Sequence, residues 1–147
     1  MRTVFRSASA LLAVALLLSL APLPASASRS TEMLDRINRK REARGLRELR
    51  ASNHLTRKAR SHTRRMIRTN QLFHSRIGRT SRGTSWGENV GCARSPRRLF
   101  RSLMRSRPHR ENILRRGFHR AGVGVLEARG RNICGRRSVW TTQIFLS

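Results

Sequence analysis

An apolar run near the N-terminus limits what this chain can fold into. Two arginines precede the run at residues 10–20, and Ala25-Ser26-Ala27 supplies the small side chains of a signal-cleavage site. The run is shorter than the roughly 20 residues that a membrane-spanning helix needs, and no later segment is apolar enough to span a membrane. We therefore expect residues 1–27 to be a cleaved signal peptide and residues 28–147 to form one secreted domain. An uncleaved membrane anchor is the alternative.

The charge of the chain is strongly positive. It contains 33 Lys and Arg against 7 Asp and Glu, and loss of Arg2 and Arg6 with the signal lowers the formal net charge from +26 to +24. A field of this sign attracts anionic polymers or an anionic lipid surface, and we expect a partner of this kind. No motif indicates a specific nucleic-acid partner. Because nearly all the cations are arginine, a compositional bias of the genome is the alternative explanation of the charge.

The chain has two cysteines, Cys92 and Cys134. An even number of cysteines in an exported chain favours a disulfide, because the compartment is oxidising. Their wide separation excludes a CxxC redox or zinc motif. We expect a Cys92–Cys134 disulfide, with two buried thiols as the alternative.

Helical periodicity predicts four helices. The first begins after Ser30-Thr31 as its N-cap and ends at Gly45, and the second covers residues 52–70. Prolines at the first helical position start the third helix at Ser95-Pro96 and the fourth at Pro108. One face of the second helix carries side chains at i, i+4, i+7 and i+11: Leu55, Ala59, His62 and Met66. We expect His62 to be a hydrogen-bonded core residue.

The C-terminal part of the chain changes to a strand pattern. Residues 121–126 carry apolar side chains two apart, and residues 138–146 are rich in β-branched and aromatic side chains. Residues 71–91 contain four glycines among polar residues, so we expect a long loop there. Helices that precede strands predict an α+β domain in which the helices pack on an antiparallel sheet.

Four segments stand out together: Phe73-His74-Ser75, Trp86 to Gly91, Pro108 to Leu114, and Gly122 to Val125 with Trp140 to Phe145. In this order and spacing they resemble the CAP superfamily of cysteine-rich secretory, antigen 5 and pathogenesis-related 1 proteins. The likeness is to its compact bacterial secreted members and covers nearly all of residues 28–147. The resemblance implies a three-layer α-β-α sandwich with a central, mostly antiparallel sheet.

The resemblance also implies a cleft. In family members with the full site, two histidines and two glutamates line the cleft, and some of these proteins bind a divalent metal there. His74 matches the first histidine and Glu88 the first glutamate, whereas Ser106 and Trp140 stand at the other two positions. This chain therefore keeps half of the family's set.

Two hypotheses follow for this cleft, to which Asn89 also belongs. In one, His109 replaces a missing ligand, and His74, Glu88 and His109 hold a divalent metal such as zinc, whose usual ligands include imidazole and carboxylate. In the other, Glu88 hydrogen-bonds a protonated His74 and ties the long loop to the core. The second hypothesis requires no cofactor.

The sequence shows no convincing catalytic residue. Ser75 is adjacent to His74 in the chain, and the lone aspartate, Asp35, lies in the first helix, so no serine–histidine–aspartate set is indicated. We expect a monomeric, non-enzymatic extracellular binding module with a His/Glu cleft. The alternatives are a metal-dependent hydrolase of envelope polymer or peptide, and a cationic antimicrobial or polyanion-binding protein.

Overall fold

The structure is a computed structural model that describes residues 25–76 and 84–147, so the predicted signal peptide lies mostly outside the described residues. None of the described helices is long and apolar enough to cross a membrane. The helices and strands follow in this order: α1 (Ala25–Glu42), β1 (Arg50–Ala51), α2 (Asn53–Thr69), β2 (Trp86–Ala93), α3 (Pro96–Arg105), α4 (Arg107–Leu114), β3 (Arg120–Arg129) and β4 (Arg137–Leu146).

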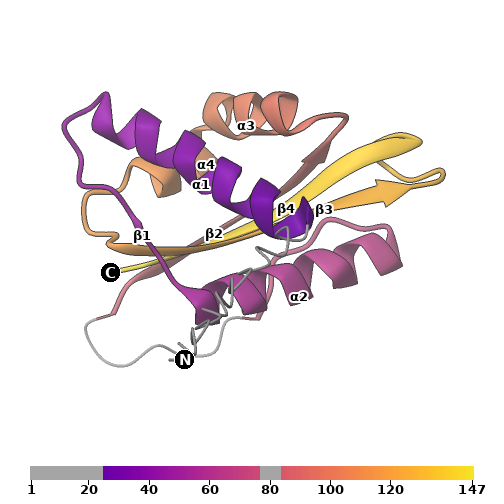
Figure 1. The fold of residues 1–147 in the computed structure, drawn as a ribbon, viewed down its shortest axis with the longest axis horizontal. Helices are drawn as coiled ribbons and strands as arrows, with labels where there is room; N and C mark the ends of the chain where they lie inside the picture. Colours follow the sequence, from indigo (N-terminus) through magenta and orange to yellow (C-terminus); the bar gives the residue numbers. More distant parts are fainter. Residues whose placement is uncertain (1–24, 77–83) are drawn as a thin grey trace, which may run out of the picture.

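The strands form one sheet between two layers of helices. Their order is β1-β3-β4-β2, and only the short pairing of β1 with β3 is parallel. Helix α2 packs on β3 and β4 from one face, while α1, α3 and α4 lie on the opposite face (Figure 1). The predicted α+β class, the three layers and the mostly antiparallel sheet are therefore confirmed. Strand β2 lies at an edge of the sheet, which matters for the site described below.

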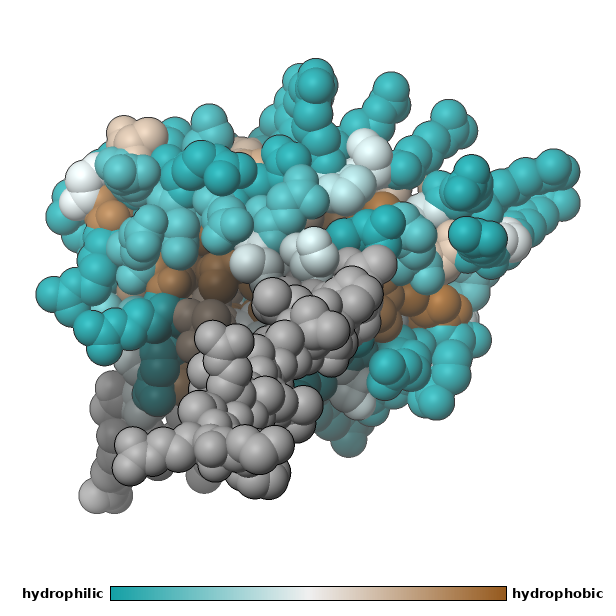
Figure 2. Space-filling view, in the orientation of Figure 1, coloured by the Kyte–Doolittle hydropathy of each residue, from teal (hydrophilic) through white to brown (hydrophobic). Residues whose placement is uncertain are grey.

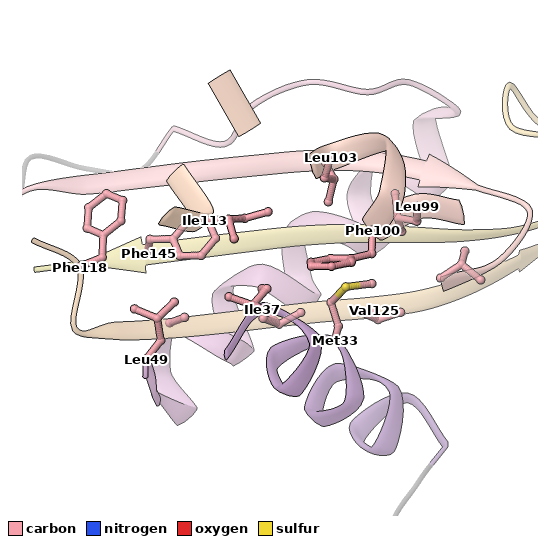
Figure 3. Packing of buried hydrophobic residues seen from close by; sticks show 13 residues of the cluster. Met33, Ile37, Leu49, Leu99, Phe100, Leu103, Ile113, Phe118, Val125 and Phe145 are labelled. Atoms are coloured by element: carbon pink, nitrogen blue, oxygen red, sulfur yellow. The ribbon is translucent and has the colours of Figure 1, made fainter. Parts of the chain in front are cut away.

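The largest part of the core lies between the sheet and the layer of α1, α3 and α4. Met33 and Ile37 of α1 meet Phe100 of α3, Ile113 of α4 and Phe145 of β4 in one buried cluster (Figure 3). Smaller clusters lie under α2, around Met66 with Trp140 and around Leu55 with Ile144. Burial of this apolar surface holds the three layers together.

Helix α2 lies unusually close to the sheet because β3 has two glycines beneath it. A Cβ atom added to Gly122 would lie 2.1 Å from the carbonyl carbon of Leu55, and one added to Gly124 would lie 2.5 Å from that of Ala59. Any side chain at these two positions would push α2 away from β3. The Gly-Val-Gly-Val segment of β3 thus sets the spacing of two layers.

The predicted boundaries of α2 and the predicted start of α3 are confirmed by their caps. The Ser52 hydroxyl accepts a hydrogen bond from the Leu55 N–H, and Asn70 ends α2 in the left-handed conformation with φ of 51°. The Ser95 hydroxyl accepts from the Arg98 N–H, and Pro96 occupies the first turn of α3. Side-chain acceptors and a proline at these positions satisfy or remove otherwise unpaired backbone donors.

The prediction that Ser30-Thr31 caps the first helix is wrong, because α1 begins at Ala25. Ser30 is buried inside the helix, and its hydroxyl accepts a hydrogen bond from the Val125 N–H of β3 at 3.2 Å. The hydroxyl that would serve as a local cap is used instead to dock the helix on the sheet.

The predicted loop over residues 71–91 is also too long, because β2 begins at Trp86. Two of the glycines that suggested a loop, Gly87 and Gly91, lie in β2 and allow close packing there. A Cβ atom at Gly87 would lie 2.7 Å from Oδ1 of Asn112 on α4. The part of the predicted loop at residues 77–83 lies outside the described residues.

Candidate functional site

The carboxylate of Glu88 is the centre of the candidate site. Its side chain on β2 is only 1% exposed. Oε1 accepts hydrogen bonds from Nδ1 of His74 and from the backbone N–H of Ser75, both at 2.8 Å, and Oε2 accepts from the Ser75 hydroxyl. Donors therefore occupy both oxygens, which is the condition under which a buried carboxylate is tolerated.

His74 is held in one orientation by this contact. Because a carboxylate can only accept, Nδ1 carries the proton, and in the neutral ring Nε2 is then the unprotonated nitrogen. The His74 side chain is 60% exposed, so the ring stands between the buried Glu88 and solvent. The pair fixes residues 74 and 75 against the edge strand, with Nδ1 of the ring bound to Glu88.

The segment before His74 is anchored by a second histidine. Nε2 of His62 donates a hydrogen bond to the Phe73 carbonyl at 2.7 Å, and the two rings meet edge to face with centroids 5.0 Å apart. His62 is buried on α2, as predicted for a hydrogen-bonded core histidine. Residues 73–75 are thus attached both to α2 and to β2.

Asn89 lies on the opposite face of β2 from Glu88, because neighbouring strand residues point to opposite sides. It is fully buried, and its Nδ2 donates to the His109 carbonyl at 3.0 Å and to Oε1 of Gln143 at 3.1 Å. Asn112 of α4 in turn donates to Oδ1 of Asn89 at 3.0 Å and to the Glu88 carbonyl at 3.2 Å. The structure therefore places Asn89 where it attaches α4 to the sheet.

His109 lies on α4 and is half-buried. Burial lowers the pKa of its imidazole, and the positive charge of His74 lowers it further. His74 is therefore close enough to His109 to disfavour the charged form of the His109 ring. The backbone carbonyl of His109, rather than its ring, makes the hydrogen bond to Asn89.

The described residues do not fit the family's metal. No three His, Cys, Asp or Glu side chains among residues 25–76 and 84–147 are grouped as ligands of one ion, so His74 and Glu88 are not joined by His109 in such a set. Trp140, at the second histidine position, is buried in the core, and its Nε1 donates to the Ser138 hydroxyl at 2.9 Å. The Glu88 oxygens are already occupied by donors. The metal at this site therefore stays a prediction that the described geometry does not support.

The predicted disulfide is present. Cys92 of β2 is bonded to Cys134, which lies between β3 and β4, with 6.0 Å between the Cα atoms. Neither cysteine is available as a nucleophile or a metal ligand while the bond is intact. The disulfide joins the edge strand to the β3–β4 connection.

Arg41 is a structural residue that the sequence reasoning did not identify. Its guanidinium is buried in the described structure without an ion-paired carboxylate, and burial lowers its pKa. Three nitrogens donate to four backbone carbonyls, those of Arg47, Ile113, Arg115 and Phe118. The sequence does contain a pattern that predicts burial of Arg41. It lies four residues after Ile37, on the face of α1 that Met33 and Ile37 predict to be buried.

A family model described as the cysteine-rich secretory protein family, CAP, matches residues 34–145. No curated protein matches the chain. Among solved structures, an outer surface protein from Borrelia burgdorferi has a TM-score of 0.66 at 12% identity, and the match covers 80% of this chain and 92% of that one.

Two further solved structures share the fold and come from larger bacterial proteins. An extracellular protein containing an SCP domain from Bacillus anthracis has a TM-score of 0.65 at 20% identity over 85% of this chain. A cysteine-rich secretory protein from Staphylococcus aureus has a TM-score of 0.58 at 18% identity over 85% of this chain. The alignments span 44% and 40% of those two proteins.

The family model matches more than half of the length of this chain. The chain therefore belongs to the cysteine-rich secretory protein, or CAP, family.

Proposed function

We propose that this CAP domain is an extracellular module that binds anionic polymers and catalyses no reaction. An extracellular location is supported by the disulfide and by the similarity to a Bacillus anthracis protein that is described as extracellular. The binding function rests on the family's cleft being built differently here and on the charge of the chain.

The proposal that the domain catalyses no reaction rests on the hydrogen bonds of the Glu88 carboxylate. A general base or a metal ligand needs an oxygen lone pair that faces the reacting water or the ion. Glu88 instead has its oxygens turned to His74 and Ser75, at 1% exposure. Its role is to hold residues 74 and 75 against the sheet.

A hydrolase would have to act through His74 alone. Nε2 of its neutral ring can accept a proton from a bound water, with Glu88 orienting the ring from the other side. The hydroxyl of Ser75, the residue next to His74, donates to Glu88. The site thus has an oriented base but no attached nucleophile, which favours binding over catalysis.

The anionic partner is supported by the composition of the chain. The formal net charge is +26, with Lys and Arg outnumbering Asp and Glu by 33 to 7. Arginine guanidinium groups make paired hydrogen bonds to phosphate and carboxylate, so they favour such partners beyond simple charge attraction. Each bound cation releases a counterion of the polymer, which makes the affinity dependent on salt.

The test is equilibrium binding of the purified processed chain to a heparin fragment, measured with zinc and with EDTA, for the wild type and for His74→Ala. We expect the same dissociation constant, within about twofold, in all four measurements, because the site of binding is the cationic surface. Loss of binding on chelation or in His74→Ala would favour the metal-dependent alternative. No binding at low salt would refute the proposed partner class.

A further inference from the structure

Helix α3 presents a regular row of arginines. Arg97, Arg101 and Arg105 follow i, i+4, i+8, so they lie on one side of the helix at intervals of about 6 Å. All three are exposed, as is Arg98 beside them. The opposite side of α3 is buried through Leu99, Phe100 and Leu103, which fixes the helix on the sheet. The row is therefore held by a rigid element.

A surface groove of about 750 Å³ runs along this row. Its lining combines the arginines with small and hydroxyl side chains: Ala93, Ser95, Arg97, Arg98, Arg101, Ser102 and Arg105. The groove has no acidic lining residue, and none of its arginines forms an ion pair with a described carboxylate. Its guanidinium groups are consequently available to an external anion, and the Ser95 hydroxyl, which accepts from the Arg98 N–H, still has a proton to donate.

A second hollow of about 300 Å³ continues the basic surface toward the β3–β4 hairpin. Arg94, Arg129 and Arg137 line it, and Arg94 lies in the sequence between Ala93 and Ser95, which line the first groove. Its one acidic residue, Glu127, forms an ion pair with Arg29 at 2.8 Å. Long hydrophilic side chains project from both regions, above α3 and at the hairpin end (Figure 2).

We infer that the α3 groove, defined by Arg97, Arg98, Arg101 and Arg105, binds a single extended phosphodiester polymer. This inference rests on the proposed function and names the binding surface and the ligand chemistry. Successive phosphates of one strand can each meet one arginine of the row, with the second hollow receiving the continuing chain. Arginine forks donate to two oxygens of a phosphate, and the Ser95 and Ser102 hydroxyls lie in the same groove.

The lining of the two hollows favours a polymer without bases, such as a glycerol-phosphate chain. Proteins that bind single-stranded nucleic acid stack its bases on aromatic side chains along the basic groove. Neither hollow has an aromatic lining residue. The groove can therefore hold the charged backbone but offers no stacking surface for bases.

The test is fluorescence anisotropy with a labelled glycerol-phosphate oligomer of about ten units, using the processed chain at low salt. The triple variant Arg97→Gln, Arg101→Gln, Arg105→Gln removes the row. The control, Arg57→Gln, Arg64→Gln, Arg68→Gln, removes the same charge from exposed positions of α2. We expect the α3 variant to bind at least about 30-fold more weakly and to lose about 2 from its salt slope, with the control within about threefold of the wild type.

Each outcome decides between the claims. Wild-type binding that both triple variants weaken equally would overturn the α3 site while leaving the proposed function intact. If the wild type bound the heparin fragment but not the glycerol-phosphate oligomer, the phosphodiester ligand would be overturned, and if it bound neither at low salt, the proposed function would be overturned as well. A thermal midpoint within about 3 °C of the wild type checks that the variants are folded. An oligothymidylate with the same number of phosphates that bound about tenfold tighter, or an oligoglutamate that bound equally well, would overturn the base-free phosphodiester ligand.

Discussion

At the scale of residues, Glu88 of the edge strand forms a hydrogen-bonded cluster with His74 and Ser75. Glu88 is buried and accepts from His74 and from two groups of Ser75. These hydrogen bonds stabilise the buried carboxylate, and the carboxylate in turn holds His74 and Ser75 in place. The cluster therefore serves the attachment of residues 74–75.

Glu88→Gln should lower the free energy of unfolding by about 2 kcal/mol, because one carboxylate oxygen becomes an NH2 group that faces a donor. Urea unfolding measures this change. The matched control is Glu111→Gln, which removes an exposed i,i+4 partner of Arg107 and should cost under about 0.5 kcal/mol. A loss for Glu88→Gln no larger than that of the control would contradict the structural role of Glu88.

His109 should make stability depend on pH. Its pKa is lowered by burial and by the charge of His74, so the unfolded chain binds more protons at this residue than the folded chain. This contribution to stability is full above the unfolded pKa of about 6.5 and is lost as pH falls from there through the lowered folded pKa. His109→Gln keeps the carbonyl that binds Asn89 and removes the titration.

The measurement for His109 is the free energy of unfolding between about pH 5 and about pH 7.5. The drop on the acid side should be smaller in His109→Gln than in the wild type. His54→Gln, at an exposed position of α2, is the control and should keep the wild-type drop. Equal drops in all three proteins would show that burial of His109 has no effect on stability.

At the scale of elements, the closeness of α2 to β3 depends on the absence of two side chains. Gly124→Ala should lower the free energy of unfolding by at least about 2 kcal/mol, since the new Cβ would lie 2.5 Å from backbone atoms of α2 and the helix would have to shift. In Gly117→Ala the new Cβ would have no neighbour within 4 Å, so this control should change stability by under about 0.5 kcal/mol. Similar losses in both variants would contradict the packing argument.

The elements that could be predicted from the sequence are those with local signals. Helices α2 and α3 have a cap, a periodic apolar face or a proline at the start, and β3 and β4 have strand composition. Strand β1 has only two residues, and β2 carries glycines that allow its contacts with α3 and α4. These two strands depend on neighbours far away in the sequence, so local patterns did not reveal them.

The same limit applies to the candidate site. The pairing of His74 with Glu88 came from the family resemblance, because the two residues are 14 positions apart in the sequence and no local pattern connects them. The roles of Ser75 and Asn112 were missed, since each is defined by a hydrogen bond to a distant residue of β2. Arg41 had a local signal, its place on the buried face of α1, but its four carbonyl partners are set by the fold.

At the scale of the whole molecule, the groups that stabilise the fold and the arginines that carry its charge lie in different places. Apolar clusters on both faces of the sheet and one disulfide hold the layers together. The arginines of α3 and of the hairpin end lie outside these clusters, where their mutual repulsion opposes compaction only weakly through solvent. An external polyanion would relieve that repulsion when it binds.

The most direct test of this account is the salt dependence of binding. The dissociation constant of the processed chain for the glycerol-phosphate oligomer is measured by anisotropy from about 50 to about 200 mM sodium chloride. Seven arginines line the two hollows along α3 and the hairpin, so we predict contact with six or more phosphates and a loss of affinity of about 10³-fold or more. Weak binding at the lowest salt, or a loss under about tenfold, would contradict the account and leave the arginines as a consequence of composition alone.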